Sequence, residues 1–292
     1  MKVLRWIDML STGGPGLNFS TVFRSSKRLD VDGAIGSLRE PVHDAGSLQA
    51  VTLAFHAEKL HDQHVWKKVK RVAEWMAQQN IKATFFVYPL RAAVAGKSIA
   101  ERVQRLGALG HEIAQHTHFY AGVKIAEHEK LDDLSETNVV HCLRRDFETL
   151  MNFGFSPKGF SAGSWYINDA ILDELVALGF VYDCSAQFPR PNASPAGPNY
   201  RCLRRPRYYS KGDGRLLCLP TTCSLGEWFK WGGRMRRESD QCYQIVYLHD
   251  YDLLSPKLDL LLFCFLRLIK WKVLGESVSV AEYCVASGGS NS

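Results

Sequence analysis

Short apolar runs with the length of buried strands alternate with amphipathic helical segments from about residue 50 onward. The strand-like runs are residues 51–56, 82–87 and 111–116, and the helical segments between them are residues 66–79 and 99–109. Strands separated by helices cannot pair as hairpins, so successive strands run parallel and the helices cover the sheet. The chain is therefore predicted to form an α/β fold around a parallel sheet.

The same alternation continues toward the end of the chain. Ser135 and Asn168 are suited to cap helices, and Gly154 and Gly179 follow the expected helix ends. An apolar pattern of helical spacing also predicts a core-facing helix within residues 258–274, with an interfacial membrane helix as the alternative. Further strands are expected at residues 180–183, 215–219, 244–248 and 277–280.

One domain accounts for most of the chain. Its 292 residues, 46% of them hydrophobic, suffice for a single α/β barrel. We expect a Gly- and Ser-rich N-terminal extension over residues 1–48 and a barrel domain over residues 49–288. The eight cysteines contain no C-x-x-C pair, so reduced thiols are expected rather than a cysteine zinc site.

Histidines gather where one of these strands ends. His116 and His118 are two residues apart in the segment 110–120, and this spacing places them on one face of a strand. Catalytic side chains of α/β barrels collect at the carboxyl ends of the strands, and histidine is a common metal ligand. A single histidine on such a run is more often a hydrogen-bonded core residue than a ligand. The clustering favours a metal site.

Several segments, in order along the chain, resemble the polysaccharide deacetylases, the family with the NodB homology domain that is also called carbohydrate esterase family 4. The resemblance implies a distorted (β/α) barrel and a metal-dependent hydrolase that removes an N-acyl group, such as acetyl, from a sugar or glycan precursor. The matching segments are Val51–Glu58, Ile81–Val87, Gly110–Tyr120, Lys158–Trp165, Tyr182–Ser185 and Ile245–Asp250.

Important positions depart from the family pattern. The family's first aspartate is the general base, and its second aspartate binds the metal together with two histidines. The positions that match are His56, Ala57, His116 and Tyr120, so two of the three metal ligands are replaced. Ser161 stands where the family carries an arginine. The family mechanism therefore cannot be transferred unchanged.

A rearranged metal site would compensate for these replacements. His56, Glu58 and His116 form a set of two histidines and one carboxylate suited to a divalent ion, with zinc the first choice. In an alternative assignment, Glu58 is the base and His118 or Tyr120 becomes a ligand.

The remaining site residues follow from the resemblance. His249 matches the family's general acid, which protonates the departing amine, and Asp183 or Asp250 is expected to tune it. We expect the substrate to contact His118, Tyr120, Ser161, Trp165 and Arg205.

Positive charge is concentrated in residues 190–240, which contain eleven Lys or Arg against four Asp or Glu. Aromatic residues lie among these cations, as in a rim that stacks sugars and attracts phosphate or uronate groups. The expected partner is thus an acylated sugar, glycan or glycan precursor that carries negative charge. A solvated loop is the plainer interpretation, and no nucleic-acid motif is present.

The N-terminus does not resemble a secretion signal. Asp8 interrupts its apolar stretch and no cleavage pattern of small residues follows, so a cytoplasmic protein without a transmembrane segment is expected. Two functional alternatives stay open. One is an inactive deacetylase fold that binds a glycan or a partner in envelope biosynthesis, and the other is an amidohydrolase for a non-sugar C–N bond.

Overall fold

The computed structural model describes residues 38–41, 50–89, 97–119, 135–189, 201–230 and 243–288. Tyr120, the Gly-rich cluster at residues 13–16 and the ends of the basic segment at 190–200 and 231–240 lie outside the described residues.

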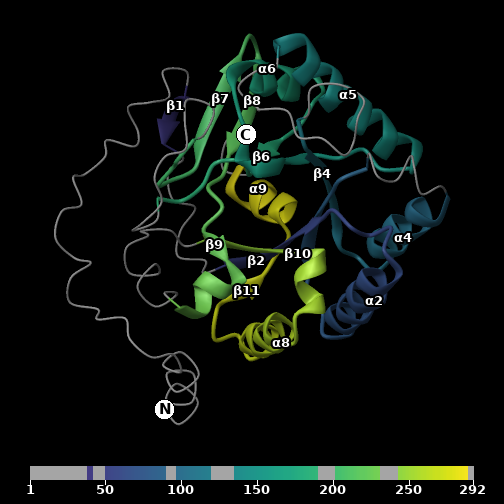
Figure 1. The fold of residues 1–292 in the computed structure, drawn as a ribbon. Coiled ribbons are helices and arrows are strands. Elements are labelled where there is room, and N and C mark those ends of the chain that lie inside the picture. The colour runs from purple at the N-terminus through teal and green to yellow at the C-terminus, as the bar shows by residue number, and fades with distance from the viewer. Residues whose placement is uncertain are drawn as a thin grey trace, which may run out of the picture.

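A curved, mostly parallel sheet forms the centre of the molecule (Figure 1). Its strands follow the order β8-β6-β5-β4-β3-β2-β10, with β9 beside β10 and with β7 and β1 added antiparallel at the other edge. This architecture confirms the predicted distorted (β/α) barrel. The strands are β1 (Leu38–Pro41), β2 (Ala50–Ala57), β3 (Ala83–Val87), β4 (Glu112–Thr117), β5 (Gly159–Ala162), β6 (Tyr182–Asp183), β7 (Arg207–Lys211), β8 (Gly214–Cys218), β9 (Cys223–Ser224) and β10 (Tyr243–His249).

Helices cover the outer face of this sheet (Figure 1). Asp62, Ser135 and Asn168 cap three of them by accepting hydrogen bonds from backbone N–H groups of the first turn, which confirms the last two as caps. Two short 3-10 turns, η2 (Gly163–Trp165) and η3 (Asp250–Leu254), follow β5 and β10. The helices are α2 (Gln63–Gln78), α4 (Lys97–Ala108), α5 (Glu136–Asn152), α6 (Asp169–Ala177) and α8 (Pro256–Lys270).

Alternate residues of each strand face opposite sides of the sheet. In β2, Leu53 and Phe55 pack with the helices, whereas Ala54 joins an inner cluster with Phe86 and Tyr182. The even-numbered positions of β2 and β4 and the odd-numbered positions of β10 therefore point into the barrel. This alternation decides which strand-end residues can reach one another.

The C-terminal segment closes the inside of the barrel at the amino ends of the strands. A strand was expected over residues 277–280, but β11 (Glu276–Ser277) is two residues long and α9 (Val280–Gly288) begins at Val280. The N–H of Val280 donates to Thr84 Oγ1 and that of Ala281 donates to the Glu112 carboxylate. These acceptors satisfy the first N–H groups of a helix, so the chain turns into α9 instead of extending the strand.

The structure also bears on the predicted core helix and on the predicted N-terminal extension. The predicted core helix is α8, and its inner face buries Leu262, Phe265, Leu266 and Ile269. β1 lies inside the expected N-terminal extension yet pairs with β7. In the described part of the chain, no helix has both the length and the apolar character needed to cross a membrane.

Candidate metal and catalytic site

Three histidines point into the barrel at the carboxyl ends of their strands. His56 is on β2, His116 on β4 and His249 on β10, and His249 pairs in register with His56. Their positions follow the inward alternation of each strand. The ring centroids of His56 and His116 are 4.7 Å apart, and those of His56 and His249 are 5.4 Å apart. The sheet thus brings together residues that are far apart in sequence.

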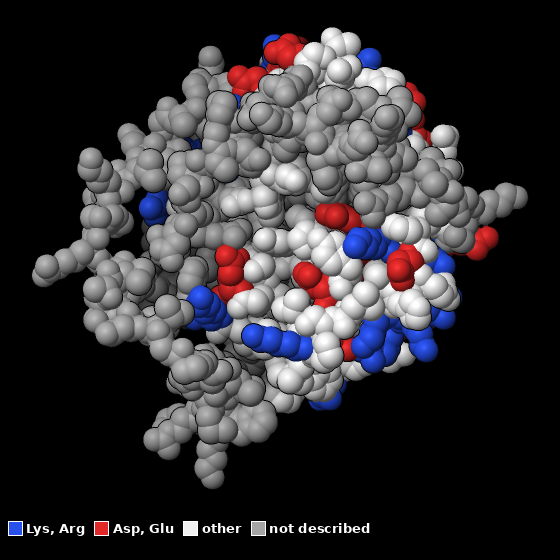
Figure 2. Space-filling model, viewed as in Figure 1, with Lys and Arg blue, Asp and Glu red and all other residues white. Residues whose placement is uncertain are grey.

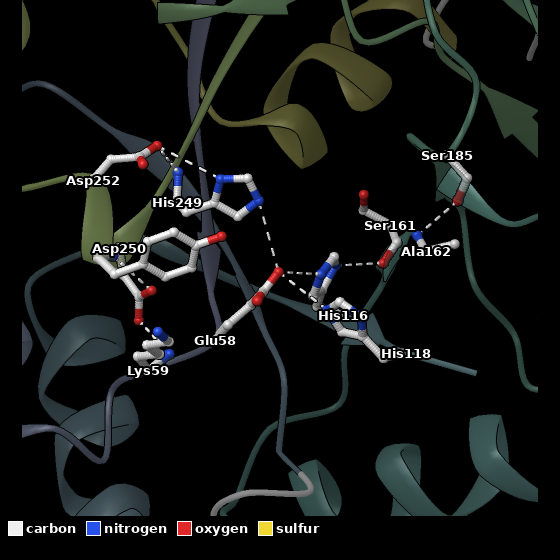
Figure 3. A network of polar contacts seen from close by, with 11 residues as sticks. Glu58, Lys59, His116, His118, Ser161, Ala162, Ser185, His249, Asp250 and Asp252 are labelled. Carbon is white, nitrogen blue, oxygen red and sulfur yellow. Dashed lines mark hydrogen bonds and ion pairs between the residues drawn. The ribbon is translucent and has the colours of Figure 1, made fainter. Parts of the chain in front are cut away.

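Glu58 lies at the centre of this histidine cluster (Figure 3). The chain leaves β2 at Ala57, and the Glu58 carboxylate turns toward the histidines. Its Oε1 is 3.1 Å from Nε2 of His118, 3.3 Å from Nε2 of His116 and 3.7 Å from Nε2 of His249. Burial acts to raise the pKa of Glu58, but hydrogen bonds with His116 and His118 outweigh it, so the pKa lies well below its usual range. The carboxylate is therefore ionised.

The orientation of His116 is fixed from the opposite side of its ring. Its Nδ1 lies 2.7 Å from the carbonyl oxygen of Ser161, which can only accept, so Nδ1 donates the hydrogen bond. Burial, the largest influence, lowers the pKa of His116, which keeps the ring neutral. A neutral ring that donates through Nδ1 carries its lone pair on Nε2. That lone pair faces the Glu58 carboxylate, so either a proton on Nε2, which makes the hydrogen bond to Glu58, or a metal cation must lie between them.

Glu58, His116 and His118 fit a metal ion. Among the described residues, these three form the group whose ligand atoms all lie within 4.8 Å of one another. Ligands about 2.0–2.1 Å from a tetrahedral zinc ion are roughly 3.3 Å apart, close to the separations of Oε1 from the two ring nitrogens. The donor set and its spacing thus suit a divalent metal ion.

The group with ligand spacing differs from the set that was expected first, because it contains His118 in the place of His56. His118 is one of the two residues that the alternative assignment named as a ligand. Sequence spacing shows that His116 and His118 share a face, but it cannot show which histidine reaches Glu58.

Gly163 makes room for the His118 ring. A Cβ atom at this position would lie 2.4 Å from both Cγ and Nδ1 of His118, far inside the contact distance. The ring of His118 therefore rests against bare backbone at the end of β5, and only glycine allows this position.

His56 lies in an aromatic environment outside the ligand group. Its ring centroid is 5.2 Å from that of Tyr247 and 5.4 Å from that of Trp165. Burial, followed by the neighbouring His116 and His249, lowers the pKa of His56 well below its usual value. Trp165 itself has a φ of 61°, in the left-handed region that side chains other than glycine rarely adopt. This strained turn holds the indole against His56.

Asp252 is the carboxylate that contacts His249. It accepts the backbone N–H of His249 at 2.9 Å, and its Oδ2 lies 3.6 Å from Nδ1 of the ring. Burial acts to lower the pKa of His249, but Asp252 and the charges of Glu58 and Asp250 raise it above its ordinary value. Sequence reasoning missed Asp252, although its position three residues after the histidine in a turn was a usable signal.

The described hydrogen bonds connect Asp183 to His116 through Ser185 and the backbone of β5. Its Oδ1 accepts the N–H of Ser185 at 3.0 Å and also the Ser185 hydroxyl. Oγ of Ser185 in turn accepts the N–H of Ala162 at 2.8 Å, next to the Ser161 carbonyl that holds His116. Burial raises the pKa of Asp183 to about 7. The structure thus places Asp183 behind His116, and no described contact joins it to His249.

Other predicted residues are less central. Asp250 accepts the backbone N–H groups of Lys59 and Tyr251 and so fixes the turn after β10. Ser161 is fully buried, and its carbonyl, not its hydroxyl, makes the described contact with the site. Arg205 is exposed, and no described contact joins it to the histidine cluster.

A sequence comparison identifies the class of domain. Residues 51–182 match the sequence model of the family Polysaccharide deacetylase. Residues 51–182 therefore resemble a NodB-type polysaccharide deacetylase domain. Among curated proteins, none matches this chain.

Solved structures share the fold at low sequence identity. A protein from Mycobacterium smegmatis assigned as a polysaccharide deacetylase is 18% identical with a TM-score of 0.63, covering 86% of this chain and 94% of that chain. One from Pseudomonas aeruginosa PAO1 with the same assignment is 14% identical with a TM-score of 0.60, covering 90% and 99%. Puue allantoinase is 14% identical with a TM-score of 0.62, covering 91% and 99%. At these identities the likeness establishes the fold.

Proposed function

We propose that this protein is a metal-dependent hydrolase that removes an N-acyl group, acetyl in the simplest case, from a sugar or glycan precursor. The observation that carries the proposal is the Glu58 carboxylate facing ring nitrogens of His116 and His118 at 3.3 and 3.1 Å. Glu58, His116 and His118 would hold the ion. A divalent ion such as zinc supplies two things when bound: a lower pKa for water and polarisation of the acyl carbonyl.

The other side chains supply proton transfer and shape. His249 is the proton donor to the departing amine, since its ring faces the site and Asp252 holds Nδ1 on the far side. His56 stands where the family has its base, and burial leaves it neutral and able to accept a proton. Trp165 and Tyr247 form an apolar wall beside His56, suited to packing against an acyl group or a sugar ring.

We also propose that the substrate is anionic and that the protein works in the cytoplasm. Arg204, Arg205 and Arg207, which lie just before β7 or at its first position, are among the described cations of the basic segment, and they would attract phosphate or uronate groups. The described cysteines are free thiols, which suits a reducing compartment.

Acyl release by the untagged protein tests this function. After reconstitution with zinc, manganese or cobalt, acetate release is measured from N-acetylated sugar oligomers, and ring opening is measured for a cyclic non-sugar amide. We expect release from the sugar, loss of that activity in Glu58→Gln, and a rate about a hundredfold or more lower in His249→Ala. Ring opening of the non-sugar amide without acetate release from the sugar would favour the amidohydrolase alternative. Metal binding without hydrolysis of either substrate would favour the inactive binding domain.

A further inference from the structure

Exposed apolar side chains are concentrated along one stretch of the chain. Of the large hydrophobic residues that are exposed in the described structure, five lie between residues 254 and 273. Leu260 is 54% exposed, Phe263 48% and Trp271 58%. Single exposed apolar residues are ordinary, but a cluster of this kind marks an interaction surface.

These residues share the outward face of α8. Positions 260, 263, 267 and 271 are separated by three or four residues, so their side chains follow one another along one side of the helix. The opposite side holds the buried residues that attach α8 to the core. Trp75 of α2 continues the surface, with its ring centroid 6.5 Å from that of Phe263. We name the set Leu260, Phe263, Arg267, Lys270 and Trp271 the α8 surface.

Cations accompany the apolar residues. The guanidinium of Arg267 lies 4.8 Å above the Phe263 ring, and Lys257 and Lys270 have no ion pair within the described chain. The carboxylate of this stretch, Asp259, is already paired with Lys68 and Arg71 of α2, and Glu276, which follows the stretch, is paired with Lys272. Figure 2 shows Lys and Arg side chains gathered at the lower right of the molecule, where Figure 1 places α2, the helix that pairs with α8 through Lys68 and Asp259. The α8 surface therefore carries an uncompensated positive charge.

We propose that the α8 surface docks on a bilayer that contains anionic lipids, with α8 lying in the plane of the headgroups. Leucine and aromatic side chains flanked by lysine and arginine are the composition of interfacial helices, in which the apolar groups enter the acyl boundary and the cations meet lipid phosphates. Trp271 at the helix end suits the headgroup level. This property goes beyond the proposed hydrolase and does not depend on it.

Charge argues against a second copy of the chain as the occupant. A two-fold contact through this surface would set the basic residues of one copy against the same basic residues of the other. The acidic partners that could relieve this repulsion, Asp259 and Glu276, are held within their own chain. An anionic lipid surface has the opposite charge and needs no such partner.

Vesicle flotation with the full chain tests the proposal. The vesicles are phosphatidylcholine alone, or phosphatidylcholine with about a third phosphatidylglycerol, a charge density typical of anionic leaflets. The variants are Phe263→Gln with Trp271→Gln, and Lys257→Gln with Lys270→Gln. Met151→Gln with Val181→Gln is the matched control, because these exposed apolar residues lie on other elements. Thermal melting by circular dichroism verifies that each variant folds.

The wild type and the control should float with the anionic vesicles and not with the neutral ones. Binding should weaken at high salt and fall about tenfold or more in each of the two other variants. Absence of flotation, or equal flotation of the wild type and both variants, overturns the proposal. A dimer in light scattering that is lost in the Phe263 and Trp271 variant also overturns it and assigns the surface to a second copy.

Discussion

Glu58 Oε1 lies 3.1 Å from Nε2 of His118, and this contact joins the end of β2 to the end of β4 across the mouth of the barrel. The carboxylate is ionised, and the nearby Nε2 of His116 presents a lone pair because its other nitrogen donates to Ser161. A single cation position satisfies all three groups. The first predictions concern this position.

The identity of the third ligand can be tested by substitution. His118→Ala removes a donor within the group, so bound zinc should fall at least about tenfold in mass spectrometry of untagged, reconstituted protein. His56→Ala should keep its metal, because His56 lies outside the ligand group. Loss of metal in His56→Ala with retention in His118→Ala would restore the assignment expected from sequence.

Gly163 should control metal affinity without being a ligand. In Gly163→Ala the new Cβ collides with the His118 ring at 2.4 Å, which displaces the ring and should weaken metal binding roughly 10- to 100-fold. Gly226→Ala is the control, because its Cβ would meet only Leu258, at an ordinary contact distance of 4.0 Å. Calorimetric titration of the metal-free protein with zinc measures both. Equal affinities in the two variants would show that the ring does not depend on this glycine.

Asp252 should act as a positioning residue for His249. In Asp252→Asn the ring loses the charge beside Nδ1, and we expect kcat to fall about tenfold while bound metal stays unchanged. The exposed Asp213→Asn serves as the control. A higher KM with an unchanged kcat would assign Asp252 to substrate binding instead.

Asp183 should make stability depend on pH. Its pKa is raised from 3.8 to about 7 by burial, so the folded state keeps a proton that the unfolded chain loses between these values. Its contribution is thus fully present below pH 3.8 and is lost as the pH rises through about 7. Each pKa unit is worth about 1.4 kcal/mol. The free energy of unfolding of Asp183→Asn, relative to that of the wild type, should therefore rise by a few kcal/mol as the pH is raised from acid to 8. Denaturant unfolding across this range measures the difference; a difference that is constant with pH contradicts the assignment.

The exposed arginines should affect capture of charged substrates. Arg204→Glu with Arg205→Glu should lower kcat/KM about tenfold for an anionic acylated sugar and leave a neutral one unchanged, because electrostatic steering acts on the encounter. Raised ionic strength should reproduce the effect in the wild type. If neither the two substitutions nor raised ionic strength changes kcat/KM for the anionic substrate, steering by these residues is excluded.

The local sequence determined the fold class and part of the site. Strand and helix periods recur in the order that a parallel α/β fold needs, and the two-residue period of β2, β4 and β10 put His56, His116 and His249 on the inner face. The motifs of the chain indicated the family whose sequence model matches residues 51–182. Only short-range geometry was needed for these conclusions.

Tertiary structure decided which of these side chains meet. The period of a strand sets the face of a residue but not its distance from residues on other strands. It therefore could not tell that His118, and not His56, completes the group around Glu58, or that Asp252, and not Asp183, contacts His249. The same holds for Val280, which begins a helix because Thr84 and Glu112, distant in sequence, accept the first N–H groups of α9. Contacts across the barrel depend on how the sheet curves, and that curvature is a property of the whole fold.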